Sequence, residues 1–168
     1  SWTTIDLPQE VIDSVNPGAD GVHGMSATPY DGKLALLVAG EKEALWTLDQ
    51  SGAWNCIWAA SDDATTEWAS YGTLASDGTY LYSFGGSEDN GDTLSVLRFD
   101  GASEWEYLGD LSRTAFSPEV SYSDGMFLVS SGYNSNDQGA LRSGAECIEI
   151  DADGNMEETI LDFSRLYT

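Results

Sequence analysis

Short apolar runs recur three times along the chain, each directly after an Asp-Gly pair. The pairs stand at residues 31–32, 77–78 and 124–125, and the runs end at Gly40, Gly86 and Gly132, which are 46 residues apart both times. The runs are residues 33–40 (KLALLVAG), 79–86 (TYLYSFGG) and 126–132 (MFLVSSG). A short, nearly all-apolar run is typical of a strand buried on both faces. Asp-Gly before it indicates a tight hairpin, because both residues readily adopt positive φ.

Alternating apolar and polar residues form a second pattern with a longer spacing. Three alternating segments (LWTLD, VLRFD and CIEID) end at Asp49, Asp100 and Asp151, which are 51 residues apart. The residues five positions after these aspartates are Trp54, Trp105 and Met156. Alternation over several residues predicts a strand with two different faces. The large side chain after it is expected to fill the space between neighbouring units.

Each unit is therefore predicted to contain four antiparallel strands, called a to d in chain order. Strand b is the buried run, and the other three are placed as follows. Strand a covers residues 24–30, 71–76 and 119–123, strand c covers 44–48, 94–99 and 145–150, and strand d covers 53–58, 104–108 and 155–161. A spacing of 51–52 residues counted back from Trp54 reaches Trp2, so residues 1–8 are expected to be strand d of a preceding or closing unit.

Four up-and-down strands with a period of 46–51 residues are characteristic of a β-propeller blade. In the second unit, YLYSFGG at 80–86, the strand at 96–100 and the spaced Trp105 resemble the kelch repeat. The first and third units keep the second glycine of that pattern but have Ala39 and Ser131 in place of the first. The expected fold is all-β, with about three kelch-like blades. They cover residues 24–60, 71–111 and 118–162 of one propeller segment spanning 1–168.

Three blades are too few to close a propeller, which takes 4–8 blades. We therefore expect part of a propeller, completed by missing blades or by a second copy that sets its blade 1 against blade 3 of the first. Cys56 and Cys147 fall in these two end blades, so a disulfide within one chain is not expected.

The balance of charge narrows the set of partners. The 168 residues include 29 acids and 6 bases, for a formal net charge of −23. Such a surface repels nucleic acid and anionic membranes, and it attracts cations and basic proteins. The acids are spread along the whole chain, which fits a general adaptation to solubility equally well. No apolar run reaches 18 residues, so insertion into a membrane is not expected.

The kelch resemblance implies that ligands bind at the end of the blades formed by the b–c and d–a loops. Two acidic loops fall there, at residues 61–68 (SDDATTEW) and 87–92 (SEDNGD). Their candidate ligand-binding residues are Asp62, Asp63, Glu67, Trp68, Glu88, Asp89 and Asp92. Clustered carboxylates suit calcium, but neither loop has EF-hand spacing, and solvated acidic loops are the alternative. Trp68 either stacks on a sugar or a cation or packs between blades.

A third polar loop, at residues 133–139, offers Asn134, Asn136 and Asp137 to a glycan or to solvent. The chain contains a single histidine, His23, which excludes a three-His metal centre and does not define a His-based triad. The acids offer many carboxylate pairs for glycoside hydrolysis, and their spacing selects none.

The leading expectation is a non-catalytic module, without a cofactor, that recognises protein or carbohydrate in a secreted or cell-surface protein. One alternative is part of a propeller enzyme that resembles galactose oxidase or a glycosidase. The other is a structural segment that associates through its open sheet edges.

Overall fold

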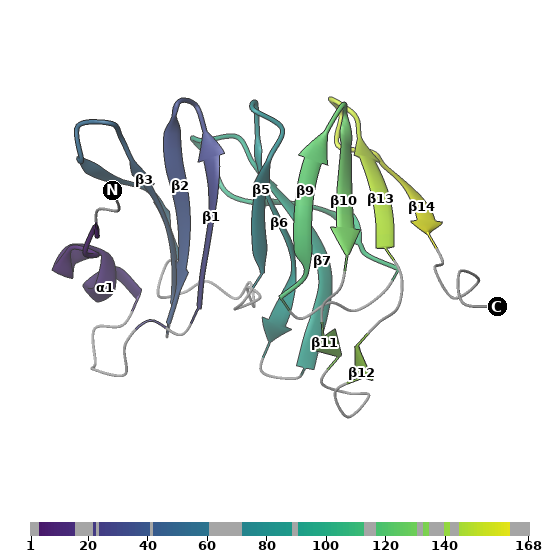
Figure 1. Ribbon diagram of the computed structural model, residues 1–168, viewed down its shortest axis with the longest axis horizontal. Coiled ribbons are helices and arrows are strands. Elements are labelled where there is room, and N and C mark those ends of the chain that lie inside the picture. Colours follow the sequence, from purple (N-terminus) through teal and green to yellow (C-terminus); the bar gives the residue numbers. More distant parts are fainter. Residues whose placement is uncertain are drawn as a thin grey trace.

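A computed structural model describes residues 4–15, 22, 24–40, 42–60, 72–88, 91–112, 117–130, 133–134, 140–141 and 145–161. The fold is all-β, as the alternation and the buried runs predict. Three four-stranded antiparallel sheets stand side by side along the long axis of the molecule (Figure 1). The tight hairpin turns lie at the upper end in that view, and the longer connections lie at the lower end. We call these the turn end and the loop end.

Each sheet has its strands in chain order, so the predicted sequence of strands a, b, c and d is confirmed. Blade 1 consists of β1 (Gly24–Tyr30), β2 (Lys33–Ala39), β3 (Glu43–Leu48) and β4 (Trp54–Ala59). Blade 2 consists of β5 (Thr73–Ser76), β6 (Leu81–Glu88), β7 (Gly91–Phe99) and β8 (Glu106–Asp110). Blade 3 consists of β9 (Glu119–Ser123), β10 (Met126–Ser130), β13 (Ala145–Ile150) and β14 (Met156–Leu161). A two-stranded ribbon, β11 (Tyr133–Asn134) and β12 (Ala140–Leu141), lies in the b–c connection of blade 3.

The apolar core lies between the blades. One buried cluster joins blade 1 to blade 2, and a second joins blade 2 to blade 3. In blades 2 and 3, the large residue before or at the start of strand d packs in these clusters, as its spacing predicts. Trp105 packs edge-on against Trp58 of blade 1, with ring centroids 6.1 Å apart. Met156 packs against the cluster between blades 2 and 3. Blades 2 and 3 are thus each anchored by this side chain to the blade before them, whereas Trp54 of blade 1 packs against the cluster of Val11 and Val38 on the other face of its own blade.

The Asp-Gly turns follow the prediction in two blades of three. In blades 1 and 3, a two-residue loop joins strands a and b, and both its residues have positive φ: 47° and 70° at Asp31-Gly32, and 52° and 87° at Asp124-Gly125. In blade 2, Ser76 pairs with Leu81, so the loop has two more residues. There the Asp77 carboxylate accepts hydrogen bonds from the N–H groups of Thr79 and Tyr80, both at 2.7 Å.

The segment before blade 1 differs from the prediction of a strand over residues 1–8. Residues 4–8 belong to no strand, and a short helix follows, α1 (Gln9–Val15). A strand d needs a strand c beside it, and no described strand occupies that place. The helix instead buries Val11 and Val15, one turn apart, against Val38 of β2. It covers the face of blade 1 that points away from blade 2.

Candidate functional site

The turn end of the blades is built from aspartates that complete turns. Between β3 and β4, the Asp49 carboxylate accepts hydrogen bonds from the Ser51 hydroxyl and from the N–H groups of Ser51 and Ala53, at 2.5, 2.8 and 3.0 Å. These hydrogen bonds, that of the Ser51 hydroxyl above all, lower the pKa of Asp49. Asp151 accepts the matching N–H groups of Asp153 and Asn155 in blade 3. Part of the acidic content therefore serves the turns.

Side chains also connect neighbouring blades at the turn end. The Arg98 guanidinium of β7 donates to Glu106 Oε2 from Nε at 3.0 Å and from Nη2 at 2.7 Å. Its Nη1 reaches the Ala152 carbonyl of blade 3 at 3.3 Å, and its Cζ lies 4.7 Å from the centre of the Tyr80 ring. Tyr30 of blade 1 donates its hydroxyl to the Thr79 carbonyl of blade 2 at 3.4 Å. The turn end is thus held by both polar and apolar contacts between blades.

The loop end contains a buried carboxyl, Glu43, at the first position of β3. Glu43 is paired with Ala39, two positions along from the pair of Leu45 with Leu37. Because alternate residues of a strand lie on the same face, the Glu43 side chain lies on the face of Leu37 and Leu45, which points toward blade 2. Only 7% of Glu43 is exposed, and no described residue donates a hydrogen bond to its Oε1. Burial raises the pKa of Glu43 to about 7. The carboxyl therefore changes protonation near neutral pH.

The repeat shows that a carboxyl is unusual at this position. Leu94 of blade 2 and Ala145 of blade 3 stand 51 and 102 residues after Glu43. The Glu43 carbonyl accepts the N–H of Ala60 at 2.9 Å, just as the Leu94 carbonyl accepts the N–H of Leu111 at 2.8 Å. Glu43 is not among the residues predicted from the sequence, although its place in the 51-residue repeat, where the other two units have apolar residues, is a usable signal. A buried acid with a raised pKa is a candidate functional group.

Most of the residues predicted from the sequence to bind a ligand lie outside the described ranges. They are Asp62, Asp63, Glu67, Trp68, Asp89, Asn136 and Asp137. The same holds for His23. The structure places the backbones of three others at the loop end. Glu88 ends β6 and Asp92 lies near the start of β7, so both belong to the tip of one hairpin, while Asn134 pairs with Ala140 in the β11–β12 ribbon.

The predicted loop at residues 87–92 is in large part a hairpin. Strand β6 continues to Glu88 and β7 begins at Gly91, with Glu88 paired to Gly91 and Ser87 to Asp92. Six residues rich in acids and with one glycine do not look like a strand, but the backbone pairing of β6 with β7 extends into them. Figure 1 shows this hairpin and the β11–β12 ribbon at the same end of the molecule.

Three further features bear on the chemistry of the site. Cys56 and Cys147 are both free thiols, in keeping with their predicted separation in blades 1 and 3. Within the described ranges, no three His, Cys, Asp or Glu side chains gather as a metal site would require. Among the same residues, no helix has the length and apolar character needed to cross a bilayer.

Three four-stranded antiparallel sheets packed face to face define blades of a β-propeller. The solved structure of YjhT has a similar fold, with a TM-score of 0.62 and 14% sequence identity. The similarity covers 83% of this chain and 44% of that chain, so this chain spans less than half of the length of YjhT. At this identity the likeness concerns the fold alone. No protein-family model matches the sequence, and no curated protein matches it either.

Proposed function

We propose that this chain is a non-catalytic recognition module that binds a protein or carbohydrate ligand at its loop end. The observation that carries the proposal is the difference between the two ends of the blades. Aspartate-capped turns and contacts between blades recur at the turn end. The loop end instead differs from blade to blade, with a long β6–β7 hairpin in one and the β11–β12 ribbon in another.

Rigid sheets that display unlike connections are a common design for recognition, because the sheets fix the position of loops that are free to vary. The resemblance to kelch repeats also supports ligand binding at the loop end. The net charge of −23 favours a ligand with a cationic surface. The proposed binding groups are the loop carboxylates, Trp68 and the amides of Asn134 and Asn136. We further propose that the parent protein is secreted or displayed on a cell surface.

Screening the protein on a glycan array and on an array of basic peptides tests the proposal. The informative variant removes three charges from the β6–β7 hairpin: Glu88→Gln, Asp89→Asn and Asp92→Asn. The matched control removes three charges from the turn end, Asp31→Asn, Asp124→Asn and Asp153→Asn; asparagine also suits these Asp-Gly turns. We expect the hairpin variant to lose about tenfold in affinity, or about 1.4 kcal/mol, and the control to bind normally. Equal losses in both variants, or no binding on either array, would contradict the proposal.

Glu43 supports a second candidate function, part of a propeller enzyme. A carboxyl with a pKa near 7 suits a general acid at neutral pH. Hydrolysis of a panel of nitrophenyl glycosides by this chain, abolished in Glu43→Gln, would favour the enzyme over the recognition module. Turnover that persists in Glu43→Gln would assign the activity to other residues.

A further inference from the structure

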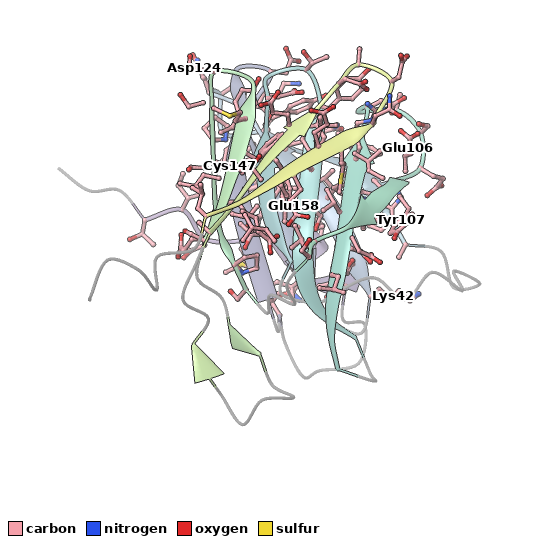
Figure 2. The ribbon with its side chains drawn as sticks, turned by 90° about the vertical axis from the view of Figure 1, so that its right-hand side faces the viewer. Lys42, Glu106, Tyr107, Asp124, Cys147 and Glu158 are labelled. Carbon is pink, nitrogen blue, oxygen red and sulfur yellow. The ribbon has the colours of Figure 1, made fainter. Side chains whose placement is uncertain are left out.

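Blade 3 has a face that points away from blade 2, on the side that Figure 2 turns toward the viewer, with Cys147 labelled on it. Side chains that are paired across neighbouring strands lie on the same face of a sheet. Two transverse rows of this outer face lie nearer the turn end, and a third row, Glu119, Ser130, Ala145 and Leu161, lies nearer the loop end. The first row is Ser121, Leu128, Cys147 and Thr159, and the second row is Ser123, Met126, Glu149 and Glu157. We call this surface the outer face of blade 3.

The first row repeats positions that join the blades elsewhere in the molecule. The corresponding rows are Ser26, Leu37, Leu45 and Trp58 in blade 1, and Thr73, Phe84, Val96 and Gly109 in blade 2. The apolar members of both rows belong to the clusters between blades. The hydroxyls bond to the next blade, with Ser26 Oγ accepting the N–H of Leu74 in β5 and Thr73 Oγ1 donating to the carbonyl of Pro118, the residue before β9.

Blade 3 keeps this order of a hydroxyl followed by two apolar residues, but its Ser121 and Leu128 are exposed and its Cys147 is half-buried. Leu128 is 39% exposed, whereas Leu37 and Phe84 at the matching positions are 6% and 0% exposed. Met126 in the second row is 41% exposed. Contiguous apolar side chains at positions that are buried in both sister blades indicate a surface suited to another sheet of the same kind.

The second row differs from its counterpart by an inversion of charge. Arg98 and Glu106 are paired across β7 and β8 in blade 2, and Arg98 also reaches the carbonyl of Ala152 in blade 3. In blade 3 the matching pair is Glu149 and Glu157. Two carboxylates directly opposite each other repel. A cation brought by a covering sheet relieves that repulsion, so the row favours a sheet that presents a lysine or an arginine.

A second copy of this chain fits the outer face poorly. Helix α1 covers the face of blade 1 that a copy would need to offer. Blade 3 against blade 3 would set Glu149 and Glu157 against their own duplicates, in a molecule with a net charge of −23. Of the two ways to complete the propeller that the sequence left open, the ring of two copies is therefore the less favoured.

We propose that the outer face of blade 3 is a docking surface for a further blade-like antiparallel sheet, which presents an apolar face and a basic residue to Glu149 and Glu157. This surface is separate from the loop end and does not depend on the proposed ligand.

The test extends the full chain with a probe blade, a copy of residues 117–161 joined after Thr168. The copy offers the face that already packs on blade 2, and residues 162–168 take the place of residues 111–116 in the connection. The copy is made in two versions, with and without Ala152→Arg. Residue 152 is chosen because its carbonyl contacts Arg98 of the preceding blade, so the arginine of the copy is placed near Glu149, which occupies the position of Arg98 in the original blade 3. In both versions the added copy, and not the original blade 3, carries Cys147→Ser. Alkylation by iodoacetamide therefore reports only on Cys147 of the outer face and on the exposed Cys56.

We expect the probe blade to slow alkylation of Cys147 about tenfold, to slow it further with Ala152→Arg in the copy, and to leave Cys56 unchanged. Leu128→Lys in the original blade 3 should abolish the protection. Leu34→Lys, at a leucine of blade 1 that is also 39% exposed, should preserve it. Unchanged reactivity of Cys147 in both extended chains would overturn the proposal, as would protection that survives Leu128→Lys.

The unextended chain provides a check that does not depend on folding of the copy. Glu149→Arg restores the charge pattern of Arg98 and Glu106, and it should raise the thermal unfolding midpoint by about 2 °C more than Glu149→Gln. Equal midpoints for the two variants would refute the repulsion between Glu149 and Glu157 on which the basic partner rests.

Discussion

At the scale of single residues, buried Glu43 and the turn aspartates make stability depend on pH in opposite directions. Glu43 holds its proton in the folded state up to about pH 7, because burial disfavours the charged form, while the unfolded chain releases it near its ordinary value of 4.5. Between these values the unfolded state binds fewer protons, so stability falls as pH rises through that window and then levels off. Asp49 and Asp151 have lowered pKa values, so their contribution is present above the ordinary range and is lost on acidification.

Replacing Glu43 by glutamine should remove the first of these effects. The amide has the same shape and no charge, so we expect Glu43→Gln to be more stable than the parent at pH 8, by on the order of 3 kcal/mol, and nearly equal to it at pH 4.5. Urea unfolding at the two pH values measures the difference. Glu119→Gln, at an exposed residue, serves as the control and should change neither value. A gain from Glu43→Gln that is the same at both pH values would show that burial of charge is not the cause.

At the scale of elements, regular strands and turns were predictable where local pattern and tertiary packing agree. Alternation and Asp-Gly turns located the strands of all three sheets, and the 51-residue spacing marked Trp105 and Met156 as contacts between blades. Helix α1 was not predicted, because its stripe consists of only Val11 and Val15 and its stability comes from packing on blade 1. The β6–β7 hairpin tip was also missed, since acidic residues have a low preference for strands.

The site was less predictable than the sheets for a related reason. Residue type alone draws attention to acidic loops such as 87–92. Glu43, by contrast, does not stand out by residue type, because what distinguishes it is its burial on the face of β3 that points toward blade 2. A comparison of the repeats position by position, rather than by their glycines and tryptophans, would have shown a glutamate where Leu94 and Ala145 stand.

Contacts between blades at the turn end can be tested at two glycines with the same backbone conformation. Gly52 and Gly154 both have φ of +86° in equivalent c–d turns, so alanine strains both, by about 1 kcal/mol. A Cβ at Gly52 meets no atom within 4 Å, whereas one at Gly154 comes within 3.0 Å of Arg98 and Leu108 of blade 2. We therefore expect Gly154→Ala to lower the free energy of unfolding by about 1–3 kcal/mol more than Gly52→Ala, measured by urea unfolding. Equal losses would mean that the turn of blade 3 is not pressed against blade 2.

At the scale of the whole molecule, the net charge of −23 sets a general condition on the fold. Only six bases are present against 29 acids, and the ion pair of Arg98 with Glu106 occupies one of them. Other acids face solvent on every blade, among them Asp31, Glu104 and Glu157. Self-repulsion of this kind opposes the compact state and weakens as salt screens it. The cores between blades must therefore supply enough apolar burial to outweigh it.

Screening and specific binding of cations can be separated by comparing salts at equal ionic strength. If the acids act only through their summed field, NaCl, MgCl₂ and CaCl₂ should raise the thermal midpoint along closely similar curves that flatten above roughly 0.5 M, where the Debye length falls to about 4 Å. A calcium site in the acidic loops at 61–68 or 87–92 would instead raise the midpoint at millimolar CaCl₂ and saturate, because a ligand that binds only the folded state stabilises it by mass action.

The variant Glu88→Gln, Asp89→Asn, Asp92→Asn distinguishes the two loops, since it removes three carboxylates from the second alone. Loss of a calcium-specific increase in that variant would assign the site to the β6–β7 hairpin, while an increase that remains would place it elsewhere in the chain. We expect no calcium-specific increase from the described acids, because no three His, Cys, Asp or Glu side chains gather among them as a metal site would require, and Oδ1 of Asp49 and of Asp151 already accepts backbone N–H groups in turns.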